Sequence, residues 1–151
     1  MIKKILVASD GSDVAKNAAE FAMDLASQTK SDIYGMYVAD AIEYLAGMNL
    51  AEMYLPMHEK IIKKLEEEGR SIVKDLEEIA AKRGVNFTGK VIKGEKPVKE
   101  IIDAARKQGA DLIVVGSHGK HASIIDVAMG EVPLKLLSAD LPCPVTVVKP
   151  K

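Results

Sequence analysis

In the segment DLIVVGS, residues 111–117, four consecutive apolar residues are followed at once by a glycine and a serine. A strand with one face in water alternates apolar and polar residues, whereas a strand covered on both faces is apolar throughout. The segment therefore predicts a strand inside a parallel sheet that carries helices on both faces.

Four further apolar runs predict the other strands. They are KKILVAS (3–9), DIYGMYVA (32–39), NFTGKVIK (86–93) and PVTVVK (144–149). Between them the apolar period is helical. Helices are predicted after the N-cap Ser12, through 61–79, from Pro97 and over 132–138. This alternation predicts an α/β fold with a single doubly wound, open, parallel five-stranded sheet.

The composition predicts one globular domain over residues 1–151. Hydrophobic residues make up 48% of the chain and charged residues 28%, a balance typical of chains that bury one core. The formal net charge is −1, aromatic residues make up 4%, and tryptophan is absent. These values argue against nucleic acid as a partner, since its recognition needs basic patches and stacking side chains.

Cysteine usage and the first residues indicate the compartment. Cys143 is the only cysteine, so no disulfide can form within the chain, as expected in a reducing compartment. The start MIKKILVASDG lacks the apolar core of a signal peptide, and no apolar run approaches the roughly 18 residues of a membrane-spanning helix. We therefore expect a cytoplasmic protein without a membrane partner.

Two turns are expected to meet at one edge of the sheet. With strand order 3-2-1-4-5, the winding direction reverses between the strand at 3–9 and the strand at 111–117, and ligands bind at such a point. The ends of these strands carry Ser9, Asp10, Gly116, Ser117, His118 and Gly119. The sequence predicts that both ends line one crevice.

The residues at this crevice suit a ligand with a phosphate. Glycines such as Gly116, Gly119 and Gly130 let backbone N–H groups approach an anion, and a helix N-terminus beyond them adds donors. Positive charge would come from Lys120, with His118 or His121.

Two residues suit the rest of a nucleotide. Asp10 only accepts hydrogen bonds when it is ionised, which fits a ribose hydroxyl or an adenine amino group. Val38, at the end of the second strand, could pack against a base.

A purely structural interpretation stays open for each of these residues. The glycines at 116 and 119 could only turn the chain out of a strand, and Asp10 could only form the turn that leads to Ser12. The histidines could be solvated loop residues, and with Cys143 they match no metal-binding spacing. The Met-rich segment 41–60 could be the ragged start of a helix with methionine as core filler, a flap over a site, or a surface for a partner or a membrane.

The sequence resembles the universal stress protein family along its whole length. The matching stretches are KKILVASDGS at 3–12, YVAD at 37–40, VIKGEKPVKEII at 91–102, DLIVVGSHGK at 111–120 and LPCPVTVVKP at 141–150. The resemblance implies an adenine nucleotide alpha hydrolase-like fold, an ATP site with or without Mg²⁺, and a role in stress response. The family's adenine contacts map to Asp10 and Val38, and its phosphate pattern G-2x-G-9x-G-(S/T) begins at Gly116 and Gly119.

The phosphate segment departs from that pattern. Ten residues separate Gly119 from Gly130, and Glu131 follows where Ser or Thr is expected. A carboxylate about 4 Å from a phosphate charge would repel it by up to about 4 kcal/mol at an effective dielectric near 20. Glu131 would therefore weaken ATP binding unless it bound Mg²⁺ or pointed outward. A family member that has lost tight ATP binding and works through protein partners remains the alternative.

We expect a binding protein with at most weak ATPase activity. The chain has no Walker GxxxxGK[ST] segment and no evident pair of base and nucleophile. A phosphoacceptor receiver domain is disfavoured, because VIKGEKP lacks the acceptor aspartate. The run at 144–149 would be a sheet edge, either blunted by its flanking prolines or open to a second copy; the resemblance implies a homodimer through it.

Overall fold

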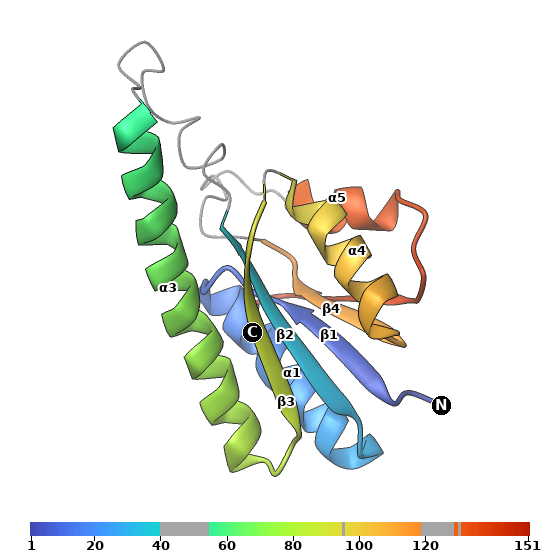
Figure 1. The fold of residues 1–151 in the computed structure, drawn as a ribbon. Coiled ribbons are helices and arrows are strands. Elements are labelled where there is room, and N and C mark those ends of the chain that lie inside the picture. The colour runs from blue at the N-terminus through green and yellow to red at the C-terminus, as the bar shows by residue number, and fades with distance from the viewer. Residues whose placement is uncertain (40–54, 95, 119–128, 130) are drawn as a thin grey trace.

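The chain forms one five-stranded parallel sheet in a computed structural model (Figure 1). The structure describes residues 1–39, 55–94, 96–118, 129 and 131–151. The strands are β1 (Lys4–Ala8), β2 (Asp32–Ala39), β3 (Phe87–Lys93), β4 (Leu112–Gly116) and β5 (Val145–Val148). Their order is β3-β2-β1-β4-β5 and each neighbouring pair is parallel, which confirms the predicted sheet.

The described helices alternate with the strands, and the first and third of them begin where Ser12 and Pro97 predict. They are α1 (Asp13–Thr29), α3 (Leu55–Lys82), α4 (Pro97–Gln108) and α5 (Glu131–Leu137). The Ser12 hydroxyl caps α1 by accepting the Ala15 N–H at 3.2 Å, and α4 starts at Pro97, whose fixed φ suits a first helical residue.

The second helix is longer than its apolar stripe predicted. Helix α3 begins at Leu55, so the last residues of the Met-rich segment belong to a helix. Residues 40–54 lie outside the described part of the chain, so the hypothesis of a flap over the site stays untested.

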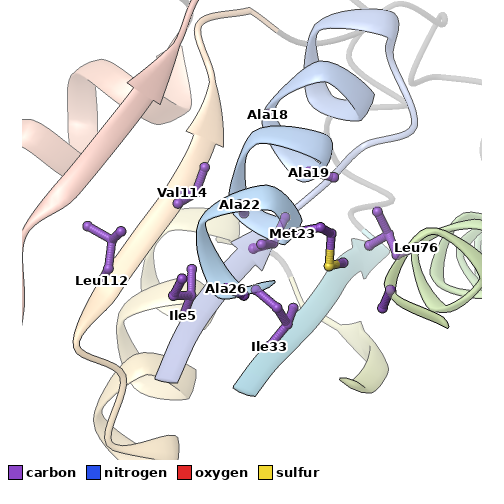
Figure 2. Packing of buried hydrophobic residues seen from close by; sticks show 12 residues of the cluster. Ile5, Ala18, Ala19, Ala22, Met23, Ala26, Ile33, Leu76, Leu112 and Val114 are labelled. Carbon is purple, nitrogen blue, oxygen red and sulfur yellow. The ribbon is translucent and has the colours of Figure 1, made fainter. Parts of the chain in front are cut away.

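Helices cover both faces of the sheet (Figure 1). On one face, small residues of α1 pack closely on β1 and β4 (Figure 2). That core cluster contains Ile5, Val7, Ala18, Ala19, Ala22, Met23, Ala26, Ile33, Leu76, Ala80, Leu112 and Val114. On the other face, Leu6, Ile113 and Val115 pack with residues of α4 and α5.

Strand β4 shows why its apolar run has no polar alternation. Leu112 and Val114 belong to the cluster under α1, whereas Ile113 and Val115 belong to the cluster under α4 and α5. Side chains of successive strand residues point to opposite faces. Gly116 therefore faces α1, and Ser117 faces the side of α4 and α5.

Candidate functional site at the carboxyl edge of the sheet

The carboxyl ends of β1 and β4 lie side by side. Val7 pairs with Val114 across these strands, so the residues that follow each of them continue next to one another. The backbone N–H of Ser9 still donates to Met36 of β2 at 3.0 Å, and that of Ser117 to Val148 of β5 at 2.9 Å. The sheet thus holds both ends at the reversal point where open α/β sheets bind ligands.

The turn from β1 to α1 is built by its own side chains. Asp10 Oδ1 accepts the Ser12 N–H at 2.9 Å, and Ser9 Oγ accepts the Gly11 N–H at 3.2 Å. Gly11 has a φ of 81°, which a residue with a Cβ rarely adopts. Asp10 therefore forms the turn that leads to the Ser12 cap, one of the two roles predicted for it.

Gly116 brings β4 close to the first turn of α1. A Cβ built on Gly116 would lie 3.0 Å from Val14 Cγ1 and 3.2 Å from the Ala15 backbone nitrogen. Gly116 remains in the strand and does not have the positive φ that Gly11 has. Its glycine character therefore serves close packing here and does not turn the chain.

The two polar residues after Gly116 have unpaired buried atoms. The Ser117 side chain is 0% exposed, and neither its Oγ nor His118 Nδ1 has a hydrogen-bond partner in the part of the chain that the structure describes. A buried hydroxyl without a partner costs roughly 1–3 kcal/mol. Such atoms at a strand end are places where a water or ligand group would be favourable.

A rim of half-buried apolar side chains surrounds this edge on the side of α4 and α5. Its members come from the ends of β1, β2 and β3 and from the first turns of α4 and α5, and all pack on the core cluster of that face. They are Ala8, Val38, Ile92, Val98 and Val132. This apolar rim offers partly exposed hydrocarbon to a flat ring, which suits a nucleobase.

The sequence prediction found one member of the apolar rim, Val38, and missed the other four. The missed signal is the pairing of Val38 with Ile92 in neighbouring strands, which becomes visible only once strand order and register are known. Val98 and Val132 sit just inside their helices, where the sequence suggests core residues.

Glu131 is the first residue of α5 and lies on its surface. Its side chain is 75% exposed and forms an ion pair with Lys135 one turn later. The carboxylate is thus directed along the helix surface, toward a cation. The other predicted phosphate residues, Gly119, Lys120 and Gly130, lie outside the described residues, as does His121.

Two shallow hollows of the described surface have charged linings instead. One lies between α3 and the end of β3, where Lys93 Nζ is 3.0 Å from Glu66 Oε1. The other lies between α1 and the C-terminal residues, where Lys151 Nζ is 4.0 Å from Glu20 Oε2. Charged side chains of both signs line each hollow, so neither offers the apolar surface that a base needs.

Among the described residues there is neither a cluster that could bind a metal ion nor a strongly nucleophilic thiol. Within ranges 1–39, 55–94, 96–118, 129 and 131–151, no group of three or more His, Cys, Asp or Glu side chains could hold a metal ion. Burial raises the pKa of the Cys143 thiol, and the nearby Asp111 raises it further, which makes this thiol a poor nucleophile. Among the described helices, none is long and apolar enough to cross a membrane.

Similar sequences match this chain over almost its whole length. The model of the universal stress protein family matches residues 1–149. Universal stress protein MJ0531 of Methanocaldococcus jannaschii is 33% identical over 99% of this chain and 83% of its own length. Universal stress protein YxiE of Bacillus subtilis is 31% identical over 99% of this chain and all of its own.

Solved structures share the fold. The structure of protein MJ0577 superposes with a TM-score of 0.83 at 25% identity, covering 100% of this chain and 98% of the other. A universal stress protein in complex with cAMP gives a TM-score of 0.68 at 20% identity, with 98% and 97% covered. One from Archaeoglobus fulgidus in complex with dAMP gives 0.65 at 19% identity, with 99% and 98% covered.

Proposed function

Because the chain belongs to the universal stress protein family, we propose that it is a binding module that holds an adenine nucleotide, ATP, between the ends of β1 and β4. The observation that carries this proposal is the meeting of the Asp10 turn, Gly116 and the apolar rim at one edge of the sheet. The two relatives in complex with cAMP and dAMP support an adenine nucleotide as the ligand class.

The base would rest on the apolar rim. Val38 lies on the strand next to β1, and both Val38 and Ala8 of β1 are half-buried on the side of α4 and α5. Packing a ring there removes apolar surface from water at about 25 cal/mol per Å². The Asp10 carboxylate, in the turn that follows β1, would accept a hydrogen bond from the adenine amino group or a ribose hydroxyl.

The sugar and phosphates would lie toward β4. The buried Ser117 Oγ and His118 Nδ1 can each form a hydrogen bond that no described residue supplies. Gly119, Lys120, Gly130 and Glu131 complete the proposed phosphate segment. Mg²⁺ would accompany the phosphates and offers one way for Glu131 to take part as an oxygen ligand.

Isothermal calorimetry with ATP, with and without Mg²⁺, tests the proposal. We expect a dissociation constant of about 1 μM or weaker. A constant of about 1 μM corresponds to a binding free energy of about 8 kcal/mol. Protein purified from cells and released by heat should also yield adenine nucleotide. The absence of binding by both the wild type and Glu131→Ser would contradict the pocket assignment.

Loss of tight ATP binding is the second candidate function. The residue type at position 131 favours it, whereas the direction of the Glu131 side chain along the surface of α5 reduces the expected repulsion. A carboxylate at the start of α5 stands where the family pattern has a hydroxyl, and Lys135 neutralises it only in part because both side chains are more than half exposed. Glu131→Ser should then bind ATP more tightly than the wild type. Glu77→Ser, an exposed position on α3, is the control for net charge and should leave affinity unchanged.

We also propose that the chain is a homodimer through β5. The sheet ends at this strand, all four of its residues are half-buried, and its open side can pair with a second copy. Exposed apolar side chains accompany this edge: Phe21 of α1 is 44% exposed, and Leu134 and Leu137 of α5 are 51% and 52% exposed. Asn17, one turn before Phe21, donates to the Lys149 carbonyl just beyond β5, at 3.1 Å.

The cellular role follows from the binding module. We propose a cytoplasmic protein of the stress response whose nucleotide state is read by a protein partner. Chemistry would be limited to slow ATP hydrolysis. Release of inorganic phosphate from ATP over hours, compared with Asp10→Ala, measures that activity directly.

A further inference from the structure

The side of Gly116 on which a side chain would stand faces the first turn of α1. The missing side chain would point at Val14 Cγ1 and at the Ala15 backbone nitrogen, at 3.0 Å and 3.2 Å, distances at which the neighbouring atoms would have to move by a few tenths of an ångström. The backbone of Gly116 is extended within β4 and lacks a positive φ. Close packing against α1, and not a positive φ, is therefore what favours glycine at this position.

The contacted backbone nitrogen also carries the cap of α1. Ala15 N–H donates to the Ser12 hydroxyl at 3.2 Å, and the Ser12 N–H donates to Asp10 Oδ1 at 2.9 Å. A displacement of the Ala15 nitrogen would therefore shift Ser12, and through Ser12 the Asp10 carboxylate. Close packing transmits such small displacements, because cores have little free volume.

We propose that Gly116 is a positioning residue: it seats β4 against Val14 and Ala15 and so places the Asp10 turn beside the end of β4. The ligand part of this inference rests on the proposed nucleotide binding. The packing part stands on the contact alone. In this role Gly116 acts through α1, and not by leaving space for a phosphate on the side of its missing side chain.

The direction of the missing side chain separates these two roles. A glycine that admits a ligand has its open side toward the ligand. The open side of Gly116 faces α1, whereas Val38 and Ala8 belong to the cluster on the opposite face of the sheet. A methyl group at position 116 would therefore meet α1 first.

A double-mutant cycle tests the inference. Gly116→Ala should weaken ATP binding in calorimetry by about tenfold and lower the thermal midpoint by roughly 2–4 °C. Val14→Ala removes Cγ1, the nearest of the three atoms that the new methyl group would meet, and leaves the Ala15 nitrogen and the Val14 carbonyl carbon at 3.2 Å, so the expected recovery is partial. In the Gly116→Ala, Val14→Ala double variant, affinity and midpoint should both exceed the values expected from adding the two single effects. Val14→Ala alone loosens the same contact and should weaken ATP binding less than Gly116→Ala does.

Other results would overturn the inference. Loss of ATP affinity in Gly116→Ala without a change in midpoint, and without recovery in the double variant, would mean that the ligand meets residue 116 directly. A wild type that binds no ATP would contradict the proposed function, and recovery of the midpoint would then decide the packing role alone. If Gly116→Ala does not fold, folding of the double variant supports the inference and its failure to fold contradicts it.

Discussion

Asp111 fastens the start of β1, because its Oδ2 accepts the backbone N–H of Lys3 at 2.9 Å. The same oxygen accepts the N–H of Lys4 at 3.1 Å, while the Asp111 N–H donates to the Lys4 carbonyl at 2.8 Å. The residue just before β4 thus ties this strand to its central neighbour at the amino edge, opposite the proposed ligand site.

These hydrogen bonds predict an acid dependence of stability. Hydrogen bonds from Lys3, and then from Lys4, hold the pKa of Asp111 below its ordinary value of 3.8. A carboxyl group with a lowered folded pKa contributes stability that is fully present above the unfolded value and is lost as pH falls through the folded value. Urea midpoints of the wild type should therefore fall below about pH 4 more steeply than those of Asp111→Asn.

Asp75→Asn is the matched control for this effect. Asp75 is exposed on α3, and its replacement should leave the slope of stability against pH close to that of the wild type. Equal slopes for Asp111→Asn and the wild type would show that the contacts with Lys3 and Lys4 add nothing to acid sensitivity.

Two buried serines should respond with opposite signs to the same substitution. Ser117→Ala removes a hydroxyl that has no partner among the described residues, so the free energy of unfolding should rise by about 1 kcal/mol. Ser31 is also buried, at 4% exposure, but its hydroxyl donates to the Ile2 carbonyl at 2.8 Å. Ser31→Ala should lower the free energy of unfolding by about 1 kcal/mol, and chemical denaturation measures both.

Destabilisation of the nucleotide-free protein by Ser117→Ala would mean that a bound water, or a residue outside the described part of the chain, already satisfies the hydroxyl. Ser117 Oγ would then no longer support a contact with the ligand.

Much of the architecture could be predicted because local signals agreed with the global pattern. The predicted strand at 32–39 has the bounds of β2, and Ser12 and Pro97 mark the starts of α1 and α4 as expected. The apolar run at 112–115 divides between both faces of the sheet. Each of these predictions needs only neighbouring residues.

The site was less accessible to sequence reasoning because its members depend on distant contacts. A glycine after a strand can serve a turn, a ligand or close packing. Only the position of Val14 shows in which direction a side chain on Gly116 would point. Ile92 joins the apolar rim through its register with Val38. The exposure of Glu131 and its pair with Lys135 depend on where α5 begins, which a loop with an altered spacing does not reveal.

The homodimer proposal predicts a selective effect of proline in β5. The Pro144 and Val148 carbonyls accept from β4, so by alternation the N–H of Val147 points to the open side. Val147→Pro should remove a hydrogen bond between copies and leave the pairing with β4 intact, since edge strands tolerate proline at outward positions. Light scattering after gel filtration should show a dimer for the wild type and a monomer for this variant.

Val147→Ala is the control, because it loses the same side-chain packing and keeps the N–H. It should remain a dimer. A dimer that persists in Val147→Pro would place the interface elsewhere on the molecule.

An amide NMR titration with ATP and Mg²⁺ would locate the bound nucleotide on the sheet. We predict shifts at the carboxyl edge, from Ala8 to Ser12, at Val38 and Ile92 and from Gly116 to His118, with Ile2, Ser31 and Asp111 at the amino edge unchanged. No shifts at any amide, or shifts centred on Ile2, Ser31 and Asp111, would contradict a nucleotide site between the ends of β1 and β4.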